Sequence, residues 1–289
     1  LSLLSFFIQS LNFGIDFRGG TSIRTESSEP IDVADYRSAL SSLDLGDITI
    51  SEVFDPNFAD DQNVAMIRIQ AQPGQEAATS TLVENSLQKL REVSEDIKFV
   101  SVESVGPKVS GELIKTAIIA VILAISAVLF YIWIRFEWQF AVGAISALIH
   151  DVILTIGIFS ALQIKFDLAI IAAILTIVGY SLNDTVVVFD RVRENLRKFK
   201  KRSLVEVMNL SINETMSRTV MTSVTTLLAL ISLFILGGDV IRGFVFAMIW
   251  GVVVGTYSSI FIASAILLWT GVKRDWSKPN AEAGTQVPQ

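Results

Sequence analysis

The sequence predicts an α-helical polytopic membrane protein that carries one α+β, ferredoxin-like domain outside the membrane. The chain is 51% hydrophobic and only 18% charged, and nearly all its long apolar runs lie between residues 113 and 272. Charge divides the chain at the same place, because residues 1–110 have a net charge of −9 and the rest of the chain has +3. This division excludes an ordinary soluble enzyme, a disordered chain and a nucleic-acid binder that relies on positive charge.

Residues 1–11 are apolar but shorter than the roughly 20 residues that cross a bilayer as a helix. We interpret them as the end of a first transmembrane span whose beginning is missing, so that the full protein would have six spans. The remnant of a secretory signal peptide is the alternative interpretation.

Residues 12–110 are expected to fold as the external domain. Their hydrophobic pattern gives the order β-α-β-β-α-β, which is typical of a ferredoxin-like plait. Strands are expected at residues 21–26, 48–54, 64–70 and 97–105, and helices at residues 31–43 and 74–93. A folded domain of this kind would serve to bind something outside the membrane.

Catalytic chemistry finds little support in the composition. The carboxylates of residues 12–110 are scattered over faces that are expected to be exposed, and they form no cluster of catalytic type. The chain has no cysteine and one histidine, which excludes disulfides, a thiol nucleophile and a Cys-based metal site. We therefore expect that the protein is not an enzyme and that it uses no metal or organic cofactor.

Residues 111–272 are expected to form a transmembrane bundle of five helices. The apolar segments cover residues 113–134, 138–160, 166–189, 218–237 and 243–271. The last segment is longer than one crossing requires, so we expect it to tilt or to begin outside the bilayer. Within it, Gly251 and Gly255 form a Gly-x-x-x-Gly pattern that favours close packing between helices.

The distribution of basic residues predicts the orientation of the chain. Eleven Lys and Arg residues lie on one side of the membrane, whereas the opposite loops hold only Lys165 and Arg242. By the positive-inside rule, the C-terminus is cytoplasmic, and residues 12–110 are periplasmic if the cell has two membranes.

The expected cytoplasmic part has three pieces. A basic loop and an amphipathic helix occupy residues 190–217, and a disordered tail occupies residues 273–289. The apolar stripe of the amphipathic helix consists of Val205, Met208, Ile212 and Met216. The basic loop is explained more simply by topology than by a binding site.

Asp184 interrupts the third complete span in the stretch TIVGYSLNDTVVVFD. A carboxylate near the bilayer centre costs about 2.5–3.5 kcal/mol on insertion scales, so it is a functional candidate by default. Asn183 and Thr185 are expected to make its surroundings polar, as is Ser181. We interpret Asp184 as a protonatable carrier, and the alternative is an interhelical bond that only fixes packing.

Arg218 begins the next span, and Thr222, Thr225 and Thr226 fall on the same helix face. This polar stripe is expected to line a water path or to serve as hydroxyl packing between helices. The Arg218 cation would favour the ionised form of Asp184, and movement of either group would let the acid take up a proton. The alternative is that Arg218 extends to the membrane surface.

His150 and Asp151 lie in the middle of the second complete span. Adjacent residues on a helix point about 100° apart, so we expect one of the pair to face the bundle and the other a partner subunit. The pair is a candidate proton relay, although a lone histidine is more often a hydrogen-bonded core residue.

Several motifs together resemble the SecF branch of the SecD/SecF family, within the resistance-nodulation-division superfamily. The motifs are NFGIDFRGGT at 12–21, VGPKVSGEL at 105–113, LIHDV at 148–152, GYSLNDTVVVFDRVREN at 179–195 and SRTVMTSVTT at 217–226. The block at 179–195 is the most specific, because the sister branch SecD lacks the Leu-Asn-Asp-Thr run. The resemblance covers nearly the whole chain, apart from the tail and the start.

The resemblance implies an accessory subunit of the Sec translocon in the bacterial inner membrane. Such proteins work with SecD, near SecYEG and YajC, and use the proton motive force to assist preprotein export and release on the periplasmic side. The family's intramembrane Asp and Arg map onto Asp184 and Arg218. The implied energy source is the proton gradient, the implied substrates are unfolded preproteins, and the lipid bilayer is the expected surrounding, with no nucleic acid.

Two other classes of function remain open from the residues alone. One is a small-molecule exporter of the same superfamily, although such exporters usually carry twice as many spans and two large external domains in one chain. The other is a non-transporting membrane-anchored binding module, in which Asp184 and Arg218 are structural.

Overall fold

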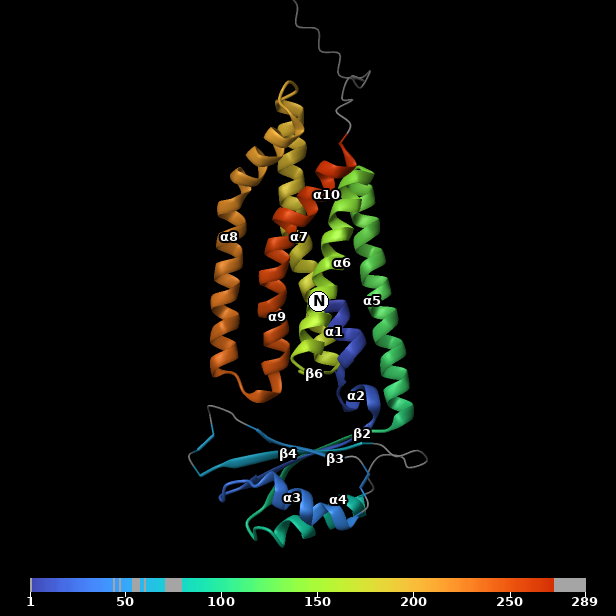
Figure 1. Ribbon diagram of the computed structural model, residues 1–289, viewed down its shortest axis with the longest axis vertical. Helices are drawn as coiled ribbons and strands as arrows, with labels where there is room; N and C mark the ends of the chain where they lie inside the picture. Colours follow the sequence, from blue (N-terminus) through green and yellow to red (C-terminus); the bar gives the residue numbers. More distant parts are fainter. Residues whose placement is uncertain are drawn as a thin grey trace, which may run out of the picture. The chain divides into compact units, whose positions relative to one another are not determined.

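The structure is a computed structural model, and it describes residues 2–43, 45–46, 48–53, 58–59, 61–70 and 80–272 (Figure 1). The chain divides into two compact units. Unit 1 comprises Leu1–Ala124, Thr155–Leu175 and Leu228–Ile249, and unit 2 comprises Ile125–Leu154, Thr176–Leu227 and Trp250–Gln289. The predicted tail at 273–289 and the predicted start of the helix at 74–79 lie outside the described residues.

Unit 1 contains the α+β domain, and the predicted order of its elements is confirmed. The elements are β2 (Gly20–Ser27), α3 (Val33–Leu40), a 3-10 turn (Ser41–Leu43), β3 (Ile48–Val53), β4 (Asn63–Gln70), α4 (Ser80–Arg91) and β5 (Lys98–Val105). The four strands form one sheet in the order β3-β4-β2-β5, and all neighbours are antiparallel. This is the topology of a ferredoxin-like plait.

The core of this domain is formed by the apolar residues that alternate along its strands. Ile23 of β2 and Ile67 of β4 are opposite each other in register and fully buried. Helices α3 and α4 lie together on one face of the sheet (Figure 1) and bury Leu40 and Leu90 against it. Burial of each such side chain contributes about 1.5–3 kcal/mol. Asp32 begins α3, since its Oδ1 accepts a hydrogen bond from the Ala34 amide at 2.7 Å.

Two consecutive glycines with positive φ angles connect α2 (Ile15–Arg18) to β2. After α1 (Ser2–Gln9) and the short β1 (Asn12–Phe13), helix α2 ends at Gly19. The φ angles of Gly19 and Gly20 are 72° and 133°, a region in which residues with a Cβ are strained. The tandem glycines therefore allow α2 to turn directly into the central strand.

Pairing in unit 1 also joins segments that are distant in the sequence. The strand β1 pairs in parallel with β6 (Lys165–Phe166). The Asp16 carboxylate accepts a hydrogen bond from the Leu168 amide at 3.1 Å, at the beginning of the third complete span. The Ser160 hydroxyl donates to the Ser10 carbonyl at 2.8 Å. These contacts fix the segment at 10–16 against the turn at 160–168.

Five described helical segments are long and apolar enough to cross a membrane, which confirms the prediction of a multi-pass membrane protein. They are α5 (Pro107–Arg135), α6 (Trp138–Ala161), α7 (Leu168–Lys198), α8 (Leu204–Leu236) and the continuous run of α9 (Asp239–Tyr257), η2 (Ser258–Ile262) and α10 (Ala263–Thr270). The segment η2 is a π-helical turn, in which the Ala263 amide donates to the Ser258 carbonyl. Such wide turns occur frequently at functional sites.

The region at 190–217 differs from the sequence prediction of a loop followed by a separate helix. Helix α7 continues to Lys198, and α8 begins at Leu204 and runs without interruption into its span. Val207 and Met208 are buried, whereas Val205 is 54% exposed. The reason is that this end of α8 packs against α7, where the Asn195 amide donates to Ser211 at 3.0 Å.

An aromatic cluster forms the core of unit 2. The rings of Phe140 and Phe189 are 5.2 Å apart in an edge arrangement, and both are fully buried. Phe136 contacts both of them. A Cβ on Gly143 would lie 3.0 Å from the Ala263 carbonyl oxygen, so α6 and α10 approach each other closely. This core holds α6, α7 and α10 together beside the polar residues described next.

Candidate functional site

The centre of the buried polar site in unit 2 is Asp151 of α6. Its side chain is fully buried. The Ser181 hydroxyl of α7 donates to its Oδ2 at 2.6 Å, and the Ser258 hydroxyl of η2 donates to the same atom at 2.8 Å. One carboxylate therefore joins three helical segments.

Two glycines in α9 allow this helix to approach α7 closely enough for the three segments to meet at Asp151. A Cβ on Gly251 would overlap the Ile177 side chain, and a Cβ on Gly255 would lie 3.1 Å from the Cβ of Ser181. The Gly-x-x-x-Gly pattern thus brings α9 close to α7, as predicted for such a motif. The π-helical turn then begins at Ser258, directly after this contact.

His150 occupies a different environment from its neighbour. Its side chain is 28% exposed, and its Nδ1 lies 3.1 Å from the Asp151 Oδ1. Its ring centroid is 6.5 Å from that of Tyr257. The two residues of the predicted pair are therefore in contact, with Asp151 facing the interior and His150 near the surface of unit 2.

Asp184 is also buried, with 3% of its surface exposed, but its bonding is unlike that of Asp151. Its Oδ2 is buried and has no hydrogen-bond partner within the described part of the chain. An ionised carboxylate in such a place costs several kcal/mol unless a charge or a proton compensates it. The site is thus suited to a group that changes its protonation state.

Arg218 of α8 is the nearby charge that acts on Asp184. Its guanidinium attracts the Asp184 carboxylate electrostatically. The Arg218 side chain is exposed. Between these two described residues there is no ion pair within 4 Å. The arginine is close enough to influence the acid without neutralising it by contact.

Within the described part of the chain, no hydrogen bond joins the Asp184 carboxylate to any of the three residues predicted to support it. Asn183 is exposed on another face of α7. Thr185 is buried, and its hydroxyl donates to the Ser181 carbonyl of its own helix at 3.0 Å. The Thr222 hydroxyl donates to the Thr219 carbonyl at 2.9 Å. Ser181 is likewise committed to Asp151 rather than to Asp184.

Sequence reasoning missed the hydroxyl groups that complete the buried site. Ser258 is one of them. A second set lies beside it, in which the Tyr180 hydroxyl donates to Ser223 at 3.5 Å and the Ser223 and Thr256 hydroxyls are 2.6 Å apart. The available signal was the run of hydroxyl-bearing residues Thr-Tyr-Ser-Ser at 256–259 inside an apolar span.

Comparison with known proteins defines the class of protein. Residues 85–273 match the family model described as Protein export membrane protein SecD/SecF, C-terminal, and residues 4–31 match the SecD/SecF GG Motif. The second match contains the tandem glycines Gly19 and Gly20. The chain belongs to the SecD/SecF family of protein export membrane proteins.

Individual relatives place it within the family. The protein translocase subunit SecF of Cereibacter sphaeroides is 60% identical over 99% of this chain and 88% of its own length. The subunit of the same name from Rhodobacter capsulatus is 60% identical over 93% of this chain and 82% of its own. That of Vibrio alginolyticus is 43% identical over 93% of this chain and 83% of its own. The similarity to SecF subunits thus extends along nearly the whole chain.

A solved structure agrees with the fold. The crystal structure of SecDF, a translocon-associated membrane protein from Thermus thermophilus, matches with a TM-score of 0.79 and 35% identity over 93% of this chain. The chain spans only 36% of that SecDF chain. A second SecDF structure, in a super-membrane-facing form, matches with a TM-score of 0.66 and 36% identity.

Proposed function

We propose that the protein is an accessory subunit of the Sec translocon that couples the proton motive force to preprotein export and release. In this proposal it acts with SecD in the bacterial inner membrane, near SecYEG and YajC, and its substrates are unfolded preproteins. The proton gradient is the energy source, and no metal or organic cofactor takes part. The similarity to SecF subunits and to SecDF supports this assignment.

The observation that carries the proposal is the buried Asp184 with an unpartnered carboxylate oxygen. Either a proton or the approach of Arg218 can remove the cost of burying its charge. Because these two solutions exclude one another, a shift of α8 relative to α7 would exchange a bound proton for a bound arginine. Such an exchange converts proton movement into helix movement.

The exposed face of α8 supports a partner at this position. Only 11% of the most apolar stretch of α8 is buried, whereas 44% of the corresponding stretch of α7 is buried. Met221 and Leu228, on the same helix as Arg218, are 61% exposed. We propose that SecD covers this face and thereby completes the path by which protons reach Asp184.

Asp151 and His150 are proposed to take part in the same proton path. The Asp151 carboxylate joins α6 and α7 through Ser181, which lies one helical turn from Asp184. His150 is partly exposed and lies 3.1 Å from Asp151, so it can pass a proton between the surface of unit 2 and the buried carboxylate.

The proposed orientation of the chain in the membrane follows from its basic residues. The excess of basic residues at 190–203 supports a cytoplasmic location for that segment and for the C-terminus. The ferredoxin-like domain is then periplasmic, where it would contact the emerging preprotein. A domain connected directly to α5 is suited to transmit helix movement to a substrate outside the membrane.

The test is proton-dependent preprotein export by vesicles that contain the complex of this chain with SecD. We expect Asp184→Asn to abolish the stimulation by the proton gradient, because asparagine cannot bind and release a proton. Arg218→Ala should have a similar effect. The matched control is Asp167→Asn, at the beginning of the same helix, where the carboxylate is partly exposed and its capping bond to Ile170 can be kept by asparagine.

Three outcomes discriminate the alternatives. Normal proton-dependent export by the Asp184→Asn complex would refute the coupling and favour a membrane-anchored binding module. Unchanged preprotein levels on depletion of the protein, with increased drug susceptibility, would favour a small-molecule exporter. Loss of stimulation in Asp184→Asn with intact SecD association and a normal Asp167→Asn control would support the proposal.

A further inference from the structure

Thr219 of α8 carries a buried hydroxyl that has no hydrogen-bond partner in the described part of the chain. Its side chain is 1% exposed. Other hydroxyls of α8 donate to carbonyl oxygens of the helix itself, among them those of Thr215, Thr222 and Thr226. Such local bonds are usual for Ser and Thr inside helices. The Thr219 hydroxyl is therefore available to a group outside its own helix.

The pairing of α7 with α8 places Thr219 opposite Asp184. The two helices are joined by the short connection at 199–203 and run in opposite directions (Figure 1). The Tyr180 hydroxyl of α7 donates to Ser223 of α8 at 3.5 Å. One helical turn after Tyr180 is Asp184, and one helical turn before Ser223 is Thr219. In antiparallel helices these two steps go in the same direction, so the two buried groups without a partner face each other.

The electrostatic attraction between Arg218 and Asp184 supports this register independently. Arg218 directly precedes Thr219, and adjacent residues on a helix point about 100° apart. Accordingly, Arg218 is exposed whereas Thr219 is buried. Two consecutive residues of α8 thus present a cation and a hydroxyl at the level of the same acid.

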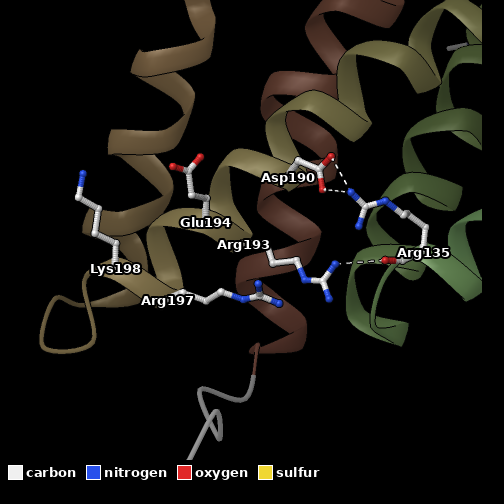
Figure 2. A pocket seen from close by; sticks show the side chains of 6 residues that line it. All are labelled: Arg135, Asp190, Arg193, Glu194, Arg197 and Lys198. Atoms are coloured by element: carbon white, nitrogen blue, oxygen red, sulfur yellow. Dashed lines mark hydrogen bonds and ion pairs between the residues drawn. The ribbon is translucent and has the colours of Figure 1, made fainter. Parts of the chain in front are cut away.

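Asp190 of α7 shows how a carboxylate is satisfied when an arginine contacts it. The Arg135 guanidinium donates to Asp190 at 3.0 and 3.2 Å, at the polar end of α7 (Figure 2). Asp190 is also 43% exposed, so water can solvate it. Asp184 is 3% exposed and forms no ion pair with any described residue. In such a place the protonated form costs least, and its O–H group then requires an acceptor.

We propose that Thr219 is the hydrogen-bond partner of protonated Asp184, an inference that rests on the proton-carrier role proposed above for this acid. The carboxylic O–H group donates to the Thr219 Oγ1. Arg218 and Thr219 then serve the two states of the acid, since the guanidinium binds the ionised form and the hydroxyl binds the protonated form. Rotation of α8 about its axis exchanges one partner for the other. Thr219 is a positioning residue in this scheme, because it orients the proton on Asp184 and carries no charge itself.

The test is infrared difference spectroscopy of the complex of this chain with SecD, recorded in acidic and in alkaline buffer. The C=O band of protonated Asp184 is identified by its loss in Asp184→Asn. We expect Thr219→Val to shift this band to higher wavenumber, because a carboxylic acid that loses a hydrogen bond has a stiffer C=O bond. Valine keeps the branched shape of threonine without its hydroxyl. Thr219→Ser retains the hydroxyl and should leave the band in place.

Thr215→Val is the matched control for this experiment. Thr215 lies one helical turn from Thr219 and is also buried, but its hydroxyl donates to the Ser211 carbonyl at 3.0 Å. The same substitution at this position should leave the Asp184 band unchanged. In export assays, Thr219→Val should reduce the stimulation by the proton gradient about two- to tenfold, the effect of one typical hydrogen bond. Thr219→Ser should restore the stimulation.

Several results would overturn the role of Thr219. One is an unchanged Asp184 band in Thr219→Val, and another is an equal shift in Thr215→Val. A third is the absence of any band that is lost in Asp184→Asn, because the acid then holds no proton. Thr219→Ala is a second variant without the hydroxyl, and the same shift is expected from it if Thr219→Val fails to assemble with SecD.

These results can be distinguished from a failure of the proposed function. Loss of stimulation in Asp184→Asn together with an unchanged band in Thr219→Val would refute the role of Thr219 and leave the coupling intact. Normal proton-dependent export by Asp184→Asn would instead refute the coupling itself.

Discussion

Asp151 and Asp184 are two buried carboxylates of unit 2 that differ in bonding. Asp151 accepts hydrogen bonds from the hydroxyls of Ser181 and Ser258, so its Oδ2 is satisfied. Asp184 has a buried oxygen without a partner in the described chain and an arginine that acts only at a distance. The comparison teaches that burial alone does not define the role of an acid in the proposed proton path. The unsatisfied Asp184 is the acid whose proton binding can change with its surroundings, whereas Asp151 would pass a proton along within a fixed set of hydrogen bonds.

The largest effect is expected when the satisfied acid is removed. Asp151→Ala leaves the buried hydroxyls of Ser181 and Ser258 without their acceptor, and we expect it to lower the free energy of unfolding by about 3–5 kcal/mol. The measurement is thermal or denaturant unfolding in detergent. Asp184→Ala should leave the free energy of unfolding unchanged or raise it, because it loses no bond to the unpartnered oxygen and removes the cost of burying that oxygen. Equal destabilisation by the two variants would remove the distinction.

A smaller effect is expected from separating the helices that meet at Asp151. Gly255→Val places a branched side chain against Ser181, so α9 must move away from α7. We expect a loss of about 1–3 kcal/mol, as is usual for overpacking. Gly111→Val is the control, since a Cβ there meets no atom within 4 Å. Unfolding midpoints of the two variants would test the role of the close approach.

A still smaller effect is expected for single hydroxyls of the same site. Ser258→Ala should lower the free energy of unfolding by about 0.5–1.5 kcal/mol, the net value of one typical hydrogen bond. A double-mutant cycle with Asp151→Asn should show a coupling of about 1 kcal/mol between the two side chains. If the effects of the two substitutions simply add, the bond contributes nothing to folding.

The smallest effect on stability is expected for Asp96. This carboxylate lies at the surface of the ferredoxin-like domain, so it shows how hydrogen bonds act on an acid that is in contact with water. Hydrogen bonds from the Ser28 and Ser94 hydroxyls and from the Ser28 amide hold the pKa of Asp96 well below its usual range. A lowered pKa in the folded state means that this stabilisation is complete above the unfolded pKa and is lost as the pH falls through the folded pKa.

Hydrogen exchange of the full chain therefore offers a measurement for Asp96. Protection of the amides at 27–28 and 94–98 should decrease only below about pH 4, and Ser94→Ala should move that decrease to higher pH. Protection that is independent of pH between 2 and 5 would contradict the assignment.

The ferredoxin-like domain was predictable because its pattern is local. Each of its strands and helices buries only one face. That face appears in the sequence as alternation in β2 and β4 and as helical spacing around Leu40 and Leu90. A sheet covered by two helices buries all of these faces. The spans were predictable for a similar reason, since a bilayer imposes a minimum apolar length. The candidate acids stood out because charge is rare inside such spans.

The remaining features depend on tertiary contacts that a single sequence does not display. Serine is common in membrane helices, so Ser258 gave no sign that it bonds to Asp151, which is 107 positions away. The continuity of α8 was missed because charged residues before Arg218 suggested the edge of the bilayer. In the structure, Glu214 is bonded by Arg191 and Asn195 of α7, which compensates its charge.

The π-helical turn at Ser258–Ile262 changes how the last span can be altered. A π-helical turn contains one residue more than an α-helical turn, so the helix after it is rotated by about 100° relative to an uninterrupted α-helix. The face of α10 that packs through Ala263 and Leu267 is therefore set independently of the face of α9 that carries Gly251 and Gly255. Deletion of a single residue within the turn would restore a regular helix and present the wrong side of α10 to its neighbours. The extra residue in the turn therefore sets the rotation of α10 relative to α9, so the buried faces of the two helices can be chosen separately.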